Sequence, residues 1–293
     1  MCDDHTEHDN EESFESGKLS RRGFSVMSLA ALAACTTSPE NAATVVEREV
    51  EITTPDGVMD AHYVAPSSGR HPAVLVWPDI MGLRPAFRLM GKRLAESGYA
   101  VLTVNPFYRA AKGQVFDATT EKFSDPPVRQ RLVALMGPAT GNPENTKKDA
   151  IAAIGWLDKQ KEVDTKRGVG TTGYCMGGPL VMRTMAFVPE RVRAGGTFHG
   201  GGLATTQPTS PVLLVPQMKS KAVLIAVAQN DDKQDPTVKD KVKAAFDAQH
   251  IPAEVEVYPA DHGWCPPDSQ VYDQVQADRA WERLLATFKV GLA

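Results

Sequence analysis

The residues Gly168-Val169-Gly170-Thr171-Thr172-Gly173-Tyr174-Cys175-Met176-Gly177-Gly178 decide the fold of this chain. Residues 169–174 are small or β-branched, which is typical of a buried strand, and residues 180–187 have the composition of a helix. A cysteine between Gly173 and Gly177 therefore lies where a strand turns sharply into a helix. This is the context of a nucleophile elbow, in which small neighbours let strand and helix approach one reactive side chain. By itself the pattern fits a buried, inert cysteine equally well, so the rest of the chain has to decide.

Alternating strand and helix patterns surround this stretch. Residues 45–53 and 58–64 alternate apolar and polar positions on either side of the turn Pro55-Asp56-Gly57, which predicts a β-hairpin. Continuous apolar runs predict strands buried on both faces, and amphipathic segments between them predict helices. Strands are expected at residues 72–78, 100–104, 169–174, 192–198, 222–228 and 253–258, and helices at 84–97, 145–161, 180–187, 238–249 and 271–290. The order predicts an α/β fold with a mostly parallel, doubly wound sheet flanked by helices.

One long connection interrupts the alternation. Residues 106–144 contain several prolines and glycines and show weak periodicity, with one helical piece near residues 128–136. Long connections on a rigid scaffold commonly carry function. We therefore expect this segment to lie over the functional site.

The charge distribution separates the first 43 residues from the rest of the chain. Residues 1–43 hold eight acidic and three basic side chains, so the net charge of −4 becomes about +1 when this segment is left out. A chain without a basic excess is not expected to bind nucleic acid. With 293 residues, 42% of them hydrophobic, the chain can bury one sizeable core. We expect one catalytic domain at residues 44–293, acting as a monomer.

The segment before this domain is expected to be an export signal followed by a polar tether. Ser20-Arg21-Arg22-Gly23-Phe24 precedes an apolar run at residues 27–34 that is too short to span a bilayer. Paired arginines before such a run resemble a twin-arginine signal, which would place the folded protein in the periplasm. Leu32-Ala33-Ala34-Cys35 also resembles a lipoprotein box, in which Cys35 would carry a lipid anchor to the membrane. Signal cleavage without lipidation is the alternative, and a cytoplasmic chain with a frayed N-terminus is a third.

The cysteines do not form a recognisable framework. Their positions, at Cys2, Cys35, Cys175 and Cys265, give neither the density of a disulfide scaffold nor the Cys and His spacing of a zinc site. We expect no metal and no organic cofactor.

Two polar residues follow apolar strands at the positions that a catalytic triad requires. Asp231 and His262 come shortly after the last two predicted strands. Polar groups at the carboxyl ends of parallel strands meet at one edge of a sheet, so both can converge on Cys175. A thiol attacks well only as the thiolate; an imidazole can take its proton, and a carboxylate can fix the imidazole tautomer. Asp232 remains a substitute for Asp231, because the pattern does not separate adjacent residues.

Three motifs together resemble the dienelactone hydrolase family. Gly173-Tyr174-Cys175-Met176-Gly177-Gly178 is similar to its nucleophile motif, Asn230-Asp231 to its acid loop, and His262-Gly263-Trp264 to its histidine loop. The resemblance covers roughly residues 45–288. It implies an α/β-hydrolase fold and a hydrolase of small esters or lactones. In such an enzyme the cysteine of the first motif is the nucleophile, the aspartate of the second orients the base, and the histidine of the third is the base.

The resemblance also implies an oxyanion hole and a partner for the resting thiol. The family has a glutamate after the first buried strand, paired with the resting thiol, where this chain has the shorter Asp79 in Pro78-Asp79-Ile80-Met81-Gly82. Asp79 is the candidate partner, and its shorter side chain leaves the resting arrangement of the thiol open. The backbone N–H groups of Ile80 and Met176 are expected to form the oxyanion hole.

Substrate binding is expected to involve Trp264 and an arginine. Family members that act on dienelactone bind the substrate carboxylate with arginines, one of them just after the histidine, where this chain has Cys265-Pro266-Pro267. Arg129 or Arg131 in the long connection could supply such a contact. The resemblance therefore predicts a small ester or lactone, with dienelactone itself a weak candidate.

Two further motifs are interpreted as structural. His199-Gly200-Gly201-Gly202 spells the oxyanion motif of lipases, but it follows the nucleophile instead of preceding it, so we interpret it as a tight loop with a structural histidine. Asp231, Asp232 and Asp235 lack the glycine and the glutamate of a calcium loop, so we interpret this segment as a solvated turn.

Cys265 gives an alternative function. It lies three residues after His262 and could approach Cys175. In an oxidising periplasm two such thiols can form a disulfide. The alternative is a non-hydrolytic exported protein, in which the two cysteines form a redox pair or the domain binds a ligand.

Overall fold

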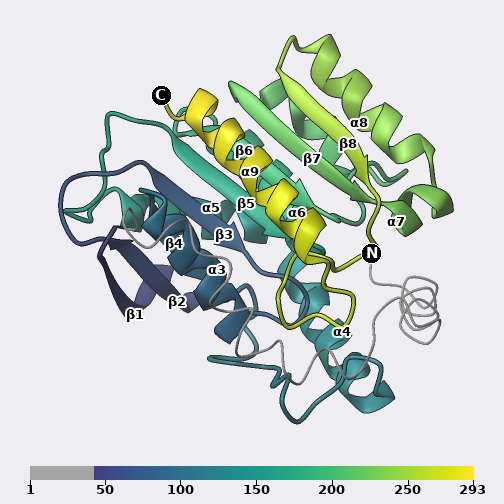
Figure 1. Ribbon diagram of the computed structural model, residues 1–293, viewed down its shortest axis with the longest axis horizontal. Coiled ribbons are helices and arrows are strands. Elements are labelled where there is room, and N and C mark those ends of the chain that lie inside the picture. Colours follow the sequence, from purple (N-terminus) through teal and green to yellow (C-terminus); the bar gives the residue numbers. More distant parts are fainter. Residues whose placement is uncertain (1–42) are drawn as a thin grey trace.

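The computed structural model describes residues 43–293, and the predicted export signal and Cys35 lie outside this range. The described residues form an eight-stranded sheet in the order β1-β2-β4-β3-β5-β6-β7-β8, with helices packed against it (Figure 1). The strands are β1 (Val45–Thr54), β2 (Gly57–Pro66), β3 (Ala73–Trp77), β4 (Ala100–Val104), β5 (Val169–Tyr174), β6 (Val192–Phe198), β7 (Ala222–Ala228) and β8 (Ala253–Tyr258). The helices are α3 (Pro85–Glu96), α4 (Pro126–Thr140), α5 (Pro143–Leu157), α6 (Gly177–Phe187), α7 (Gln229–Gln234), α8 (Thr237–Ala248), α9 (Gln274–Gly291) and the 3-10 helix η2 (Pro211–Gln217).

The sheet is antiparallel at one edge and parallel elsewhere. Strand β1 pairs with β2, and β2 with β4, in antiparallel register. Every later pair, from β4 and β3 to β7 and β8, is parallel. At the turn of the hairpin Gly57 has a φ of 141°, a conformation that glycine adopts readily. The predicted hairpin and the mostly parallel, doubly wound sheet are confirmed.

Side chains of each central strand alternate between two hydrophobic layers. On β3, Leu75 and Trp77 belong to one layer, while Val74 and Val76 belong to the other. The first layer packs against α5, α6 and α8, and the second against α3 and α9. Helix α9, drawn in yellow, crosses in front of the sheet in Figure 1. Because both faces are covered, the central parallel strands β3 and β4 are fully buried and apolar but for Thr103. The edge strand β8 is only partly buried and carries Glu254 and Glu256.

The connection between β4 and α5 lies over the carboxyl end of β5. It contains α4, which is longer than the predicted piece at residues 128–136 because it begins at Pro126 and continues through Pro138. Proline is well tolerated in the first turn of a helix, where its missing N–H would have no partner. The apolar side chains of this connection pack with the residues at the carboxyl ends of β3 and β5 in a third hydrophobic cluster. Its fully buried members are Ile80, Phe107, Phe116, Leu132, Ala139, Cys175 and Met176.

Two elements were not predicted from the sequence. Residues 229–234, interpreted as a solvated turn, form the short helix α7, so that interpretation was wrong. The proline-containing segment before β7 forms the 3-10 helix η2. Within residues 43–293, no helix combines the length and the hydropathy needed to cross a bilayer.

Candidate active site

Cys175 occupies a strained turn between β5 and α6. Its φ is 50°, a left-handed conformation that is uncommon outside glycine, and its side chain is buried. A Cβ atom at Gly173 would lie 2.5 Å from the carbonyl oxygen of Gly177, and one at Gly177 would lie 2.4 Å from that of Trp77. Only glycine therefore fits at both positions. Because Gly177 has no side chain, the turn can contact the end of β3. The predicted elbow geometry is present.

Two backbone N–H groups near Cys175 are available for an oxyanion. Ile80 and Met176 belong to the same buried cluster as Cys175. Neither of their N–H groups donates a hydrogen bond to another group within residues 43–293. Buried amides without an acceptor are rare in folded proteins, so a pair of them beside a nucleophile suits a site for developing negative charge.

His262 is fixed by two residues of the segment after β7. Its Nδ1 lies 2.7 Å from Oδ2 of Asp231, and its backbone N–H donates to Oδ1 of Asn230 at 2.8 Å. Because Nδ1 is held by the carboxylate, Nε2 is the ring atom left for the nucleophile. A side-chain hydrogen bond joins His262 to Cys175. The structure thus brings Cys175, His262 and Asp231 together at the carboxyl edge of the sheet.

The charges of its neighbours favour a protonated His262. Burial alone would lower the pKa of His262, but the Asp231 carboxylate and the Cys175 side chain raise it to about 10. An imidazolium of this kind stabilises a thiolate beside it. The geometry is therefore compatible with an ion pair between the sulfur and the imidazole.

The two adjacent aspartates on α7 have different partners. Asp232 accepts a hydrogen bond from Nζ of Lys239 at 2.6 Å, whereas Asp231 reaches His262. The helix separates the two side chains because residues i and i+1 point in different directions. Asp231 is thus the carboxylate that lies at the imidazole, and this position favours it over Asp232 as the candidate acid.

Asp79 is held by an arginine that the sequence analysis did not single out. Both carboxylate oxygens of Asp79 accept hydrogen bonds from Arg84, at 2.7 and 3.0 Å. Burial raises the pKa of Asp79, Arg84 opposes this effect, and the nearby Cys175 side chain adds to it. Asp79 therefore lies within electrostatic reach of Cys175, but its bidentate bonds go to Arg84.

His199 and Trp264 are packing residues behind His262. The ring of His199 lies 5.0 Å from the rings of both His262 and Trp264, centroid to centroid, and is completely buried. Burial, and then the neighbouring His262, hold the pKa of His199 well below its ordinary value of 6.5, so this ring is neutral. Trp264 is also fully buried and stacks on Tyr258 at 5.3 Å. Because Trp264 lies within the hydrophobic layer under α9, it supports the histidine segment from behind and presents no surface to a substrate.

The two predicted arginines lie on α4, in different settings. Arg131 is an exposed residue that forms an ion pair with Glu121 at 2.7 Å. Arg129 is half-buried on the same helix. Arg131 therefore forms a surface ion pair, and the described contacts of both arginines indicate no substrate-binding role.

Cys175 and Cys265 form no disulfide. Cys175 packs in the cluster under α4, whereas Cys265 belongs to the layer under α9. Burial raises the pKa of the Cys265 thiol well above its ordinary value, which makes it a poor nucleophile. This geometry favours a packing role for Cys265 over a redox partnership.

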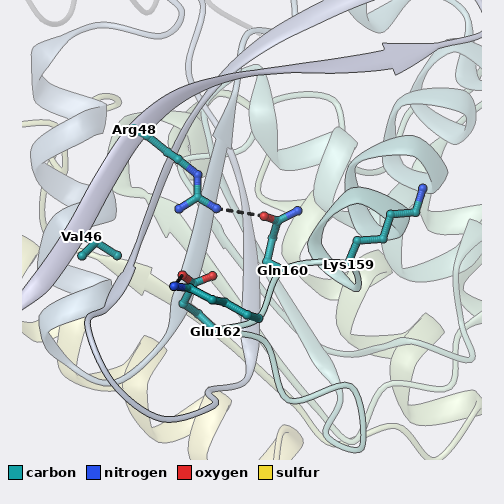
Figure 2. Close-up of a pocket in the computed structure, with 6 residues that line it drawn as sticks. Val46, Arg48, Lys159, Gln160 and Glu162 are labelled. Carbon is teal, nitrogen blue, oxygen red and sulfur yellow. Dashed lines mark hydrogen bonds and ion pairs between the residues drawn. The ribbon is translucent and has the colours of Figure 1, made fainter.

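A hollow lies away from this site, near the end of α5 and β1 (Figure 2). It has a volume of about 570 Å³ and is open to solvent. Within it Arg48 donates a hydrogen bond to Gln160 at 2.9 Å. Its lining residues are Val46, Arg48, Lys159, Gln160, Lys161 and Glu162. Residues 159–162 precede β5, so the hollow is near the amino ends of the parallel strands, opposite the edge that carries Cys175.

A nucleophile on a strand-to-helix turn, followed along the chain by its acid and its histidine, defines the class of α/β-hydrolases. Within this class the chain belongs to the dienelactone hydrolase family, whose sequence profile matches residues 59–292. The fold and the family predicted from the sequence are confirmed. Membership makes the protein a hydrolase of the carboxylic-ester class, as predicted.

Individual relatives show how far the similarity extends. A carboxymethylenebutenolidase homologue of Methylorubrum extorquens is 28% identical over 285 residues, which are 92% of this chain and 93% of the relative. The carboxymethylenebutenolidase of Pseudomonas sp. strain P51 is 30% identical over 130 residues, 44% of this chain and 51% of the relative. The crystal structure of a dienelactone hydrolase homologue from Klebsiella pneumoniae aligns with a TM-score of 0.69 and 22% identity, over 84% of this chain and 99% of that one. This structural likeness shows the shared fold.

Sequence reasoning missed Arg84 and the role of Asn230. The amide of Asn230 fixes the backbone of His262 from a position 32 residues earlier, and Arg84 lies 184 residues before its second partner, Asp268. Only Arg84 had a local signal in the sequence. It precedes Pro85 at the start of a predicted helix, and a residue before proline is held in an extended conformation.

Proposed function

We propose that the protein hydrolyses small, uncharged esters and lactones through a Cys175–His262–Asp231 triad and a thioester intermediate. The observation that carries this proposal is the continuous chain of side chains from Asp231 through His262 to Cys175, at a cysteine whose φ is 50°. The proposal agrees with the family to which the chain belongs.

The chemistry follows from the positions of these atoms. The sulfur of Cys175 attacks the carbonyl carbon, and the oxyanion is stabilised by the N–H groups of Ile80 and Met176. Collapse of this intermediate breaks the bond to the alkoxy oxygen, which takes a proton from His262. Water then gives a proton to His262 and attacks the thioester, so the acid is released and the thiolate returns. Asp231 keeps the imidazole oriented and stabilises its positive charge in both steps.

The surroundings of Cys175 support an uncharged substrate. The buried neighbours of the thiol in the cluster under α4 are apolar or aromatic. The charged groups linked to the thiol or to Asp79 include the carboxylates of Asp79, Asp231 and Asp268 and the cations Arg84 and His262. This surplus of negative charge repels a substrate carboxylate, while an apolar acyl or aryl group gains from contact with the cluster.

A matched pair of esters tests both parts of the proposal under reducing conditions. We expect wild type to hydrolyse para-nitrophenyl butyrate with a kcat/KM about tenfold or more above that for anionic para-nitrophenyl hydrogen glutarate, because of the repulsion just described. The Cys175→Ala variant supplies the background rate for each ester. Equal rates for wild type and Cys175→Ala on both esters and on small lactones would contradict the hydrolase mechanism.

The reverse preference would contradict only the uncharged substrate. Arg129→Met is the informative variant in that case, with Arg131→Met as its control on the same helix. Loss of activity toward the anionic ester alone in Arg129→Met would identify Arg129 as a carboxylate anchor.

We also propose that the folded enzyme is exported. This rests on the paired residues Arg21 and Arg22, the apolar run after them and Cys35, all in the sequence before residue 43.

A further inference from the structure

Arg84 is saturated with hydrogen bonds inside the protein. Only 1% of its surface is exposed, and the guanidinium has five N–H donors. Nε donates to Asp268 Oδ2 at 2.7 Å, and Nη2 donates to Asp268 Oδ1 at 2.9 Å and to Asp79 Oδ2 at 3.0 Å. Nη1 donates to Asp79 Oδ1 at 2.7 Å and to the carbonyl oxygen of Gly82 at 3.3 Å. Every donor is used, so Arg84 has none left for a substrate.

The two carboxylates that Arg84 binds belong to the two segments that complete the active site. Asp79 is adjacent to Ile80, in the segment between β3 and α3. Asp268 belongs to the segment between β8 and α9, six residues after His262. Arg84 therefore joins the segment that carries an oxyanion N–H to the segment that carries the base. Bidentate pairs of this kind fix both distance and angle.

Arg84 also balances a charge beside the nucleophile. Asp79 is buried and lies close enough to Cys175 for the charge of the thiolate to help raise the pKa of Asp79, after the larger effect of burial. Two further charged groups belong to this network: His262, which is paired with Asp231, and Asp268, which is bound to Arg84. Without the guanidinium, nothing among these groups would offset the charge of Asp79.

We propose that Arg84 is a positioning residue that locks the oxyanion segment to the histidine segment and keeps the charge of Asp79 from opposing the Cys175 thiolate. The inference rests on the proposed function. It assigns Asp79 a fixed place on Arg84 throughout the reaction, instead of a movable contact with the thiol.

The test compares Arg84→Met with Arg84→Lys and with the double variant Asp79→Asn/Arg84→Met, using para-nitrophenyl butyrate. Arg93→Met is the control, because Arg93 also bridges to a distant segment, bonding Asp278 on α9 at 2.9 Å, but belongs to the outer part of α3. Wild type must first show hydrolysis that depends on Cys175; without it the proposed function fails and Arg84 is not at issue. Circular dichroism and thermal melting establish that each variant is folded.

Arg84→Met is expected to lower kcat about 100-fold with little change in KM, because the oxyanion donors and the base lose their alignment. In the pH profile of kcat/KM for this variant, the rise in activity on the acid side (the acid limb) is expected to move to higher pH. An Asp79 carboxylate without its guanidinium partner disfavours the Cys175 thiolate. The double variant should return this limb to the wild-type position or below while kcat stays low. Lysine restores the charge but cannot span two carboxylates, so Arg84→Lys should keep the wild-type limb with a reduced kcat.

Three results would overturn the inference. They are a wild-type kcat in Arg84→Met, an unshifted acid limb in that variant, and a shifted limb that Asp79→Asn does not restore. If Arg84→Met does not fold, Arg84→Lys and the neutral variant Asp79→Asn/Arg84→Gln/Asp268→Asn take its place. A wild-type kcat in both of these would contradict the role of Arg84 equally well.

Discussion

Alanine in place of His262 is expected to lower kcat/KM for para-nitrophenyl butyrate by about 10⁴-fold or more, because members of a triad act as one unit. The reason is visible in the site. His262 is the side chain hydrogen-bonded to Cys175. It takes the thiol proton, which creates the thiolate, and it later gives a proton to the leaving alkoxide. Steady-state rates at pH 7 under reducing conditions measure the loss.

The control for this prediction is an exposed histidine far from Cys175. His250 follows α8 with a φ of 55°, so asparagine, which tolerates this conformation, replaces it with little strain. His250→Asn should keep the wild-type rate. A His262→Ala variant that retains a tenth of the wild-type kcat/KM would contradict the role of His262 as the base.

Asparagine in place of Asp231 is expected to lower kcat by about 10⁴-fold, the typical loss when the orienting carboxylate of a triad becomes an amide. The amide preserves the shape but removes the charge that, with Cys175, raises the pKa of His262 to about 10. The alkaline limb of the pH profile should therefore lie near pH 10 in wild type and at lower pH in Asp231→Asn. A pH series of kcat/KM measures both effects.

The same pKa shift also predicts a change in stability with pH. The pKa of His262 in the folded protein lies above its ordinary value of 6.5. Its stabilising contribution is thus complete below about pH 6.5 and is lost as the pH rises towards 10. Asp231→Asn should weaken this dependence, which chemical denaturation across the pH range would record.

The neighbouring aspartate is the matched control for this variant. Asp232→Asn removes a carboxylate of the same helix that binds Lys239 instead of His262. It should keep the rate within about twofold of wild type and leave the alkaline limb unmoved, since a partly exposed ion pair remote from the imidazole contributes little. If Asp232→Asn lost more activity than Asp231→Asn, the assignment of the acid would be wrong.

The sequence predicted the elements whose pattern is local. Several buried strands are apolar runs, and the elbow is marked by glycines that must lack a Cβ atom. Periodicity and turn chemistry therefore placed Cys175 at the turn between a strand and a helix, where the structure has it. Strand order placed Asp231 and His262 at the same edge, because residues after parallel strands must meet there. The family resemblance added Ile80 and Met176.

Contacts between distant segments could not be predicted in this way. Arg84 meets Asp268 only after β3 and β8 are placed in one sheet, and nothing in the sequence near either residue indicates the other. The packing position of Trp264 could not be predicted either. A tryptophan beside a predicted catalytic histidine suits a substrate contact or a packing contact equally well. Burial under α9 distinguishes the two.

Helix α7 shows a different limit. Its sequence Gln229-Asn230-Asp231-Asp232-Lys233-Gln234 lacks apolar residues and so carries no helical periodicity. Tertiary contacts hold it instead, among them the bond from Asp231 to His262 and the bond from Gln229 Nε2 to Asp261 at 2.9 Å. The local pattern favoured a solvated turn because those partners come from the next strand connection.

The most direct test of the proposed mechanism is mass spectrometry of the enzyme, quenched in acid during turnover of para-nitrophenyl butyrate. We predict one butyryl group on the peptide that contains Cys175, removed by neutral hydroxylamine as a thioester is, and absent from Cys175→Ala. Turnover without any adduct, or with the butyryl group on another residue, would contradict the assignment of Cys175 as the nucleophile.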